Sequence, residues 1–172
     1  MCCGGQGKGG PDGEPDDHAL GRSRGGFGTK IHLVCDSRGC PIAVDLSAGQ
    51  VHESKKFDEM MAITRVPQPR GRPRTRPNAL SGDKAYSSKK IRDWLKGHKI
   101  ESVIPTRKDE APDDTFDREK YRRRNIIERC IGWLKEARRV ATRYEKLAVS
   151  FASMIKLAII RRILLWDLPD SA

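Results

Sequence analysis

The stretch YRRRNIIERCIGWLK, residues 121–135, decides how the rest of this chain is interpreted. If the stretch is helical, successive residues advance by about 100° around the axis. One polar stripe, about 60° wide at that step, then carries four side chains: Tyr121, Arg124, Glu128 and Lys135. The apolar side chains gather on the opposite side: Ile126, Ile127, Cys130, Ile131, Trp133, Leu134 and Ala137. The pattern predicts a helix that buries one face against a sheet and presents an acid between cations on the other.

The polar stripe has two interpretations when only the residues are considered. It is either a solvated helix face, on which Arg124 and Glu128 pair at i and i+4 with a stabilisation of about 0.2–0.5 kcal/mol, or a functional surface built around one carboxylate. The spacing by itself leaves both interpretations open.

The residues upstream of this helix predict a β-hairpin followed by a helix. Phe27–Cys35 and Pro41–Leu46 are β-rich runs, and Asp36–Gly39 between them is a turn sequence. Ser54–Thr64 has apolar residues at helical spacing, with Ser54 as its expected N-cap.

A basic segment and a second group of elements follow. Arg65–Asn78 is rich in Pro and Arg and has no core-forming side chains, so it predicts a loop. Asn78–Asp83 predicts a short strand that ends at the Asp, and Glu101–Pro105 predicts another. The helix expected between them runs to about Lys96 and is capped by one of two serines: Ser87 or Ser88.

The order of the elements predicts the fold class. A long helical region runs from about Asp117, with a break, to Trp166. Strands and helices therefore alternate before one long helical region, which is typical of the α/β class. We expect one domain over residues 27–166, with a disordered Gly-rich tail at 1–26 and a short tail at 167–172.

Composition limits the class of partner. The 172-residue chain has a formal net charge of +11, which favours a polyanion, and nucleic acid above all. Its five cysteines include no CxxC pair, and Cys35 and Cys130 are expected in the core. The chain contains neither an apolar run of roughly 18 residues, as a membrane span needs, nor a signal-peptide core, so we expect a cytoplasmic protein.

Tyr121, Arg124, Glu128 and Lys135 are separated by two, three and six residues. This spacing resembles the Y-(2)-R-(3)-E-(6)-K signature of DDE transposases from bacterial insertion sequences of the IS-four/IS-five type. Three further segments resemble the same family, namely GGFGTKIHL at residues 25–33, GQVHES at 49–54 and SGDKAYSS at 81–88.

The resemblance implies an RNase H-like fold, a mixed sheet flanked by helices, which here lacks its first strand. It also implies that Asp83 and Glu128 are catalytic carboxylates that bind two Mg²⁺ ions, with Mn²⁺ as an alternative. The implied reaction is hydrolysis at the ends of the element, followed by attack of the freed 3′-hydroxyl on target DNA.

The resemblance further implies a set of contacts with double-stranded DNA, both the element ends and the target. Arg124 and Lys135 are expected at phosphates near the cut, and Tyr121 is expected to orient the substrate or the helix. The full set of implied contacts around the site is Lys84, Tyr121, Arg122, Arg123, Arg124 and Lys135. The implied protein partners are further copies of the chain on paired DNA ends, or the amino-terminal half of the transposase.

The first Asp of the family's metal triad has no counterpart in this sequence. Three acids of the tail lie outside any apolar β-pattern: Asp12, Asp16 and Asp17. Asp36 is explained by the hairpin turn, and Asp45 by the exposed face of a strand. We therefore expect weak metal binding and little or no cleavage by this chain alone, with an upstream segment restoring activity.

Two hypotheses for the function follow, with a third that is weaker. The chain is either a transposase domain that acts once it is joined to its amino-terminal half, or an inactive DNA-binding remnant that regulates the full-length enzyme. A nuclease of another RNase H-like kind is the third, and the Tyr–Arg–Glu–Lys spacing argues against it.

The basic segment contains Pro69–Pro73, with the sequence PRGRP, which resembles an AT-hook core. Such a core lays Arg side chains, here Arg70 and Arg72, in a narrow A·T minor groove. The alternative is an unstructured basic loop that touches phosphates without sequence preference. Both interpretations make Arg70 and Arg72 contacts with DNA.

Overall fold

A long antiparallel hairpin is the first large element of the computed structural model, which describes residues 18–23, 25–111, 113–114 and 116–167. Strand β2 (Gly26–Cys35) pairs with β3 (Pro41–Ala48). In the turn, one Asp36 carboxylate oxygen accepts hydrogen bonds from the backbone N–H groups of Arg38 and Cys40, each at 2.9 Å. Gly39 closes the turn at φ +87°, a conformation that favours glycine. The predicted hairpin is confirmed.

A short strand precedes the hairpin where the sequence predicts disorder. Strand β1 (Gly21–Ser23) pairs antiparallel with the start of β2, between Gly21 and Gly28 at one end and Ser23 and Gly26 at the other. A side chain at buried Gly21 would collide with Gln50, whose Oε1 lies 1.5 Å from the position a Cβ would take. Backbone pairing between glycine-rich segments leaves no apolar pattern, which explains the error for 21–23; residues 1–17 and 168–172 lie outside the described residues.

A second sheet contains the strand that leads to Asp83. Strands β4 (Ala79–Ser81) and β5 (Glu101–Val103) are parallel, with Leu80 opposite Ser102. The connection between them contains the short 3₁₀ helix η2 (Lys84–Tyr86) and helix α2 (Lys89–Gly97). Ser88 caps α2 by accepting a hydrogen bond from the Ile91 N–H, so the predicted strands, helix and serine cap are confirmed.

The helix predicted at 54–64 begins differently from the expectation. It consists of the 3₁₀ helix η1 (Glu53–Lys56) followed by α1 (Phe57–Ile63). The cap is His52, whose Nδ1 accepts a hydrogen bond from the Ser54 N–H at 3.3 Å, so Ser54 as N-cap is wrong. An imidazole that accepts from the backbone performs the role usually given to a hydroxyl or a carboxylate.

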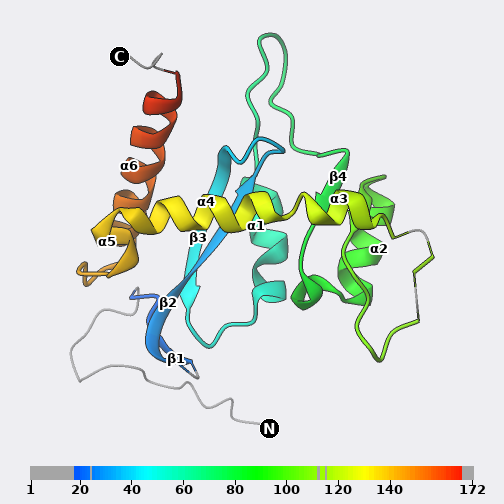
Figure 1. Ribbon diagram of the computed structural model, residues 1–172, viewed down its shortest axis with the longest axis horizontal. Coiled ribbons are helices and arrows are strands. Elements are labelled where there is room, and N and C mark those ends of the chain that lie inside the picture. The colour runs from blue at the N-terminus through cyan, green and yellow to red at the C-terminus, as the bar shows by residue number, and fades with distance from the viewer. Residues whose placement is uncertain (1–17, 24, 112, 115, 168–172) are drawn as a thin grey trace, which may run out of the picture.

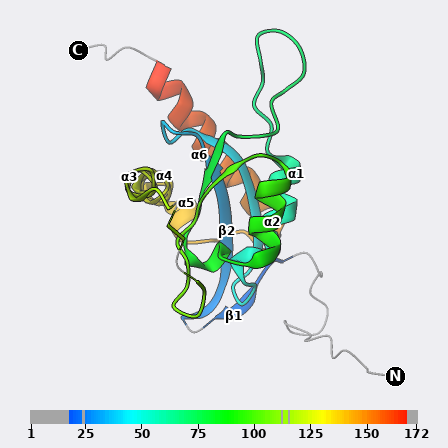
Figure 2. The ribbon, with the colours of Figure 1, turned by 90° about the vertical axis from the view of Figure 1, so that its right-hand side faces the viewer.

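The carboxy-terminal helical region is divided into four helices. They are α3 (Arg118–Arg122), α4 (Asn125–Glu136), α5 (Arg138–Ala141) and α6 (Ala148–Asp167). Figures 1 and 2 show α3 and α4 along one face of the strands, with α1 and α2 on the other face, so the strands form a middle layer. None of the helices in the described part of the chain is long and apolar enough to cross a membrane.

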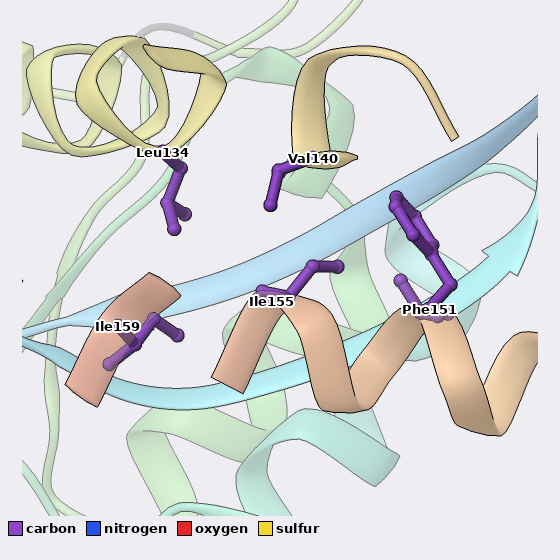
Figure 3. Close-up of a cluster of buried hydrophobic side chains, with 6 residues drawn as sticks. Leu134, Val140, Phe151, Ile155 and Ile159 are labelled. Carbon is purple, nitrogen blue, oxygen red and sulfur yellow. The ribbon is translucent and has the colours of Figure 1, made fainter. Parts of the chain in front are cut away.

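Two hydrophobic clusters hold these layers together. The C-terminal cluster consists of Leu46, Leu134, Val140, Phe151, Ile155 and Ile159 (Figure 3). The central cluster consists of Phe57, Met61, Ile91, Leu95, Ile100 and Ile104. Val34 of β2 and Leu80 of β4 both pack against the central cluster, so strands of the two sheets share one core. The α/β class is confirmed, although the described strands form a three-stranded and a two-stranded sheet.

The buried face of α4 follows the sequence pattern. Cys130 and Leu134 are each 1% exposed, and Ile126, Ile127, Ile131, Trp133 and Ala137 are partly buried. Burial raises the pKa of the Cys130 thiol to about 12. Cys130 is therefore confirmed as a core residue, whereas Cys35 is only half-buried.

Candidate active site

Asp83 stands directly beyond the end of β4 and is the N-cap of η2. Its Oδ1 accepts a hydrogen bond from the Ala85 N–H at 2.9 Å. The Arg107 guanidinium fixes the rest of η2, because it donates from Nε to the Lys84 carbonyl and from Nη2 to the Ala85 carbonyl, at 3.1 and 3.4 Å. The half-buried carboxylate is thus held on a turn that is tied down at both ends.

A polar hollow opens beside this turn. It is lined by Lys84, Pro105, Thr106, Asp113, Asp114, Phe116 and Arg118. Lys84 comes from η2, and Arg118 is the first residue of α3, so the hollow lies between the Asp83 turn and the start of the long helical region. The Phe116 ring in turn contacts the Tyr121 ring, with centroids 5.4 Å apart.

The junction between α3 and α4 brings Tyr121 and Arg124 together. The backbone hydrogen bonds at Arg123 and Arg124 run from i to i−3, at 3.2 and 2.9 Å, which is the spacing of a 3₁₀ turn. In such a turn, side chains three residues apart lie one above the other. The Arg124 guanidinium accordingly lies 5.5 Å from the centroid of the Tyr121 ring. The sequence predicts a break in the helical region but not its position.

Arg124 also contacts Glu128, one turn further along α4. Its Nη2 lies 2.5 Å from the Glu128 Oε1, and the Arg124 side chain is 25% exposed while that of Glu128 is 58% exposed. Glu128 therefore lies at the surface beside an arginine that is itself held over a tyrosine ring. Tyr121, Arg124 and Glu128 form one continuous set of contacts, in agreement with the predicted stripe.

The remaining predicted DNA contacts lie on or beside α3 and α4 outside this set, or in the loop between α1 and β4. Lys135, Arg122 and Arg123 are exposed, and Arg123 is 3.9 Å from Glu119 in an ion pair. Arg70 and Arg72 lie in the loop that projects between α1 and β4 (Figure 1). Over 18–23, 25–111, 113–114 and 116–167, no group of three or more His, Cys, Asp or Glu side chains is arranged to hold a metal ion.

Glu53 is an acid near the Asp83 turn that no pattern in the sequence singles out. The pKa of Tyr86 is raised to about 12, first by burial and then by the negative charges of Asp83 and Glu53. Burial alone would raise the pKa of Glu53, but the hydrogen bond and charge of Lys30 outweigh it, so this pKa is lowered. The Lys30 Nζ lies 2.9 Å from the Glu53 Oε1. The only sequence signal was the position of Glu53 within GQVHES.

The geometry defines an α/β domain in which one carboxylate follows a strand end and a second stands on a helix beside an arginine. A family model described as transposase DDE domain matches residues 6–163, and the chain belongs to this family. A relative from Burkholderia cepacia, named "Putative transposase for insertion sequence element IS402", is 32% identical over 131 residues, which cover 76% of this chain. The chain spans 60% of that relative's length. No solved structure matches the chain.

Proposed function

We propose that this chain acts in DNA transposition, as the part of a DDE transposase that supplies Asp83 and Glu128 to metal-dependent strand cleavage and strand transfer. The observation that carries the proposal is the surface carboxylate of Glu128, in a chain of this family. It pairs with Arg124, whose guanidinium lies over the ring of the signature residue Tyr121. Double-stranded DNA is the proposed substrate, and the cytoplasm, with the nucleoid, is the proposed location.

The donor atoms fit the proposed cation in kind but not in number. Asp83 and Glu128 offer carboxylate oxygens, which Mg²⁺ prefers, and Mn²⁺ accepts the same ligands. The described residues provide no group of three such ligands, so we propose that an upstream segment adds the third. When bound, the cations would polarise the phosphate and stabilise the departing oxygen.

The arrangement of the strands supports an RNase H-like sheet that is completed by such a segment. Strand β2 pairs antiparallel with β3, and β4 pairs parallel with β5, while Val34 and Leu80 pack on the same central cluster. A strand placed between β2 and β4 would pair with the edge of β2 beyond Gly28, where the pairing with β1 ends, and with the edge of β4 opposite β5. Its side chains would then emerge beside the turn that carries Asp83.

The protein's own residues have distinct parts in this proposal. Arg124 holds the Glu128 Oε1 and leaves Oε2 open to a ligand, so it positions the carboxylate. Lys84, at the hollow, and Lys135, further along α4, place positive charge for phosphates on either side of the cut. Arg122 and Arg123 add exposed cations at the α3 end, where DNA would enter.

The test uses the full chain together with the segment encoded directly upstream, on a plasmid that carries the ends of the element. With Mg²⁺ we expect cleavage at the ends, and Asp83→Asn or Glu128→Gln is expected to reduce its rate by at least about 100-fold. Glu136→Gln, an exposed acid on the same helix, is the matched control and should leave the rate unchanged. Equal activity of all three variants would show that Asp83 and Glu128 do not take part in the reaction.

The chain without the upstream segment provides a second comparison. We expect no cleavage from it, because it offers two carboxylates where the family's triad has three. Efficient Mg²⁺-dependent cutting by the chain alone would contradict the proposed role of the upstream segment.

A non-catalytic role is the second candidate, and the absence of a three-ligand group among the described residues favours it. In this case the chain occupies element ends or joins full-length copies in inactive complexes. If the DNA directly upstream encodes no Asp-bearing strand, and added chain lowers transposition by a full-length relative, this candidate replaces the first.

A further inference from the structure

A basic arm, defined as residues 66–74, projects from the fold between α1 and β4 (Figure 1). Two backbone hydrogen bonds close its base, from the Val66 N–H to the Arg74 carbonyl at 2.9 Å and from the Arg74 N–H to the Val66 carbonyl at 2.8 Å. The Arg74 side chain also donates to the Arg76 carbonyl and to the Asn78 side chain. The base of the arm is therefore fixed, and the Arg74 side chain is occupied by hydrogen bonds at this base.

The tip of the arm is narrow and turns at Gly71. This residue has φ +87°, and nothing lies within 4 Å of the place a Cβ would occupy, so backbone conformation rather than crowding requires glycine. Arg70 and Arg72 flank it, and both are exposed. Three prolines restrict the backbone around this tip: Pro67, Pro69 and Pro73.

No acidic residue within the arm or directly beside it compensates its positive charge. The arm and its flanking residues, 65–76, contain no Asp or Glu and five arginines: Arg65, Arg70, Arg72, Arg74 and Arg76. Within the part of the chain that the structure describes, no ion pair or hydrogen bond engages the side chains of Arg70 and Arg72. An exposed tip with two uncompensated guanidinium groups is free to bind an anionic partner that is external to this fold.

We propose that the basic arm inserts Arg70 and Arg72 into the minor groove of A·T-rich duplex DNA. The minor groove is about 6 Å wide, and it narrows further in A-tracts, where its negative potential deepens and attracts arginine. A tip of glycine between two arginines fits such a groove.

The spacing of the two arginines agrees with this mode of binding. Even a fully extended chain would separate the Cα atoms of Arg70 and Arg72 by at most about 7 Å, and the turn at Gly71 keeps them within that limit. Base pairs rise about 3.4 Å per step, so the two side chains reach positions within about two steps of one groove. The proposal rests on the proposed function only in that DNA is the partner. It does not need the carboxylates or a metal ion.

The test measures binding of the full chain, in EDTA, to fluorescent duplexes of equal length by anisotropy. An A-tract DNA, a G·C DNA and an A·U duplex RNA are compared. We expect at least about tenfold tighter binding to the A-tract than to either of the others, because the minor groove of duplex RNA is wide and shallow. Binding of all three duplexes with equal affinity overturns the proposal.

Two variants of equal charge separate groove insertion from phosphate contact. Arg70→Ala with Arg72→Ala is expected to abolish the A-tract preference, whereas Arg65→Ala with Arg76→Ala should weaken all duplexes alike and keep the preference. Gly71→Ala keeps every charge but strains the tip, so it should also reduce the preference. If both double variants weaken every duplex by the same factor, the arm contacts phosphates only and the proposal fails.

The outcome is distinguishable from failure of the proposed function. Loss of cleavage in Asp83→Asn or Glu128→Gln, or a chain that never cleaves, leaves the EDTA binding experiment unaffected. A chain that cleaves normally but shows no A-tract preference refutes only the role of the arm.

Discussion

The two hydrophobic clusters of this molecule are assembled in different ways. The central cluster draws its buried residues from one continuous part of the chain, between Phe57 and Ile104. The C-terminal cluster joins Leu46 of the hairpin to residues of α4, α5 and α6, the last of them Ile159. One core closes over short sequence separations, and the other requires distant segments to meet.

The difference matters because each cluster supports one of the two proposed carboxylates. Asp83 follows β4, whose Leu80 packs on the central cluster. Glu128 stands on α4, whose Leu134 belongs to the C-terminal cluster. The relative position of the two carboxylates therefore depends on how firmly the two clusters are joined, and β2 is a link because Leu33 packs on one and Val34 on the other.

The largest expected effect is that of emptying one cluster. Leu134→Ala, at a residue 1% exposed, should lower the free energy of unfolding by about 2–5 kcal/mol, because it leaves a cavity among long-range contacts. Ile104→Ala, at a fully buried residue of the central cluster, is the matched variant. Urea unfolding is followed by the fluorescence of Trp133, beside the C-terminal cluster, and Trp94, beside the central one, in single-tryptophan chains.

We expect the two fluorescence transitions to coincide in both variants, because the hairpin joins the clusters into one cooperative unit. Separate midpoints in Leu134→Ala would show that α4, with Glu128, is released while the Asp83 region stays folded.

A smaller loss is expected where the hairpin turn meets α4. Gly39→Ala should cost about 1–2 kcal/mol, because alanine is strained at φ +87°. The added Cβ would also lie 3.1 Å from the Ile126 Cγ1. Ile126→Ala relieves this contact, so the double variant should lose less stability than the sum of the two single losses. Strict additivity in thermal unfolding would mean that the turn and α4 do not press on each other.

The next effect concerns pH and the hairpin itself. His32 is 3% exposed, and its Nε2 lies 2.7 Å from the Ser47 Oγ. Burial lowers its pKa; the charge of Asp45 opposes this, and Lys30 is among the cations that reinforce it. The unfolded chain, with a His pKa of about 6.5, then binds more protons than the folded chain at mildly acidic pH.

Stability is therefore expected to fall as the pH drops below about 6.5 towards the lowered folded pKa. His32→Gln should flatten the dependence of the unfolding free energy on pH between about pH 7.5 and 5.5. An unchanged slope in His32→Gln would contradict the assignment.

The smallest effect is expected at the surface of α2. Lys89 and Asp93 pair at 2.6 Å, with side chains 90% and 60% exposed. Solvent screens such a pair, so Lys89→Ala should not measurably move the urea midpoint. A clear shift would mean that α2 is held on the central cluster less by apolar burial than by its charges.

The sequence predicted the elements whose apolar side chains are periodic. The hairpin, α2 and the buried face of α4 each contain such a pattern. The polar stripe of Tyr121, Arg124 and Glu128 was predicted from the same helical spacing, on the opposite face of the helix. It missed β1, because that strand pairs through backbone groups, and it assigned the cap to Ser54 because His52 is an uncommon cap.

The sequence predicted a break in the carboxy-terminal helical region, but it did not place one between α3 and α4. Arg123 and Arg124 are good helix formers, so propensity predicts no break between them. The proximity of Glu53 to Tyr86 and the Asp83 turn depends on how η1 and η2 pack together, which no local pattern encodes.

The buried thiol of Cys130 provides a built-in reporter of movement in α4. Because the thiolate is the reactive form, a thiol with a pKa of about 12 and 1% exposure reacts with alkylating reagents only when the helix lifts from the sheet. The alkylation rate of Cys130 therefore counts these openings directly. A partner segment that completes the fold should slow this reaction, even where no catalytic turnover takes place.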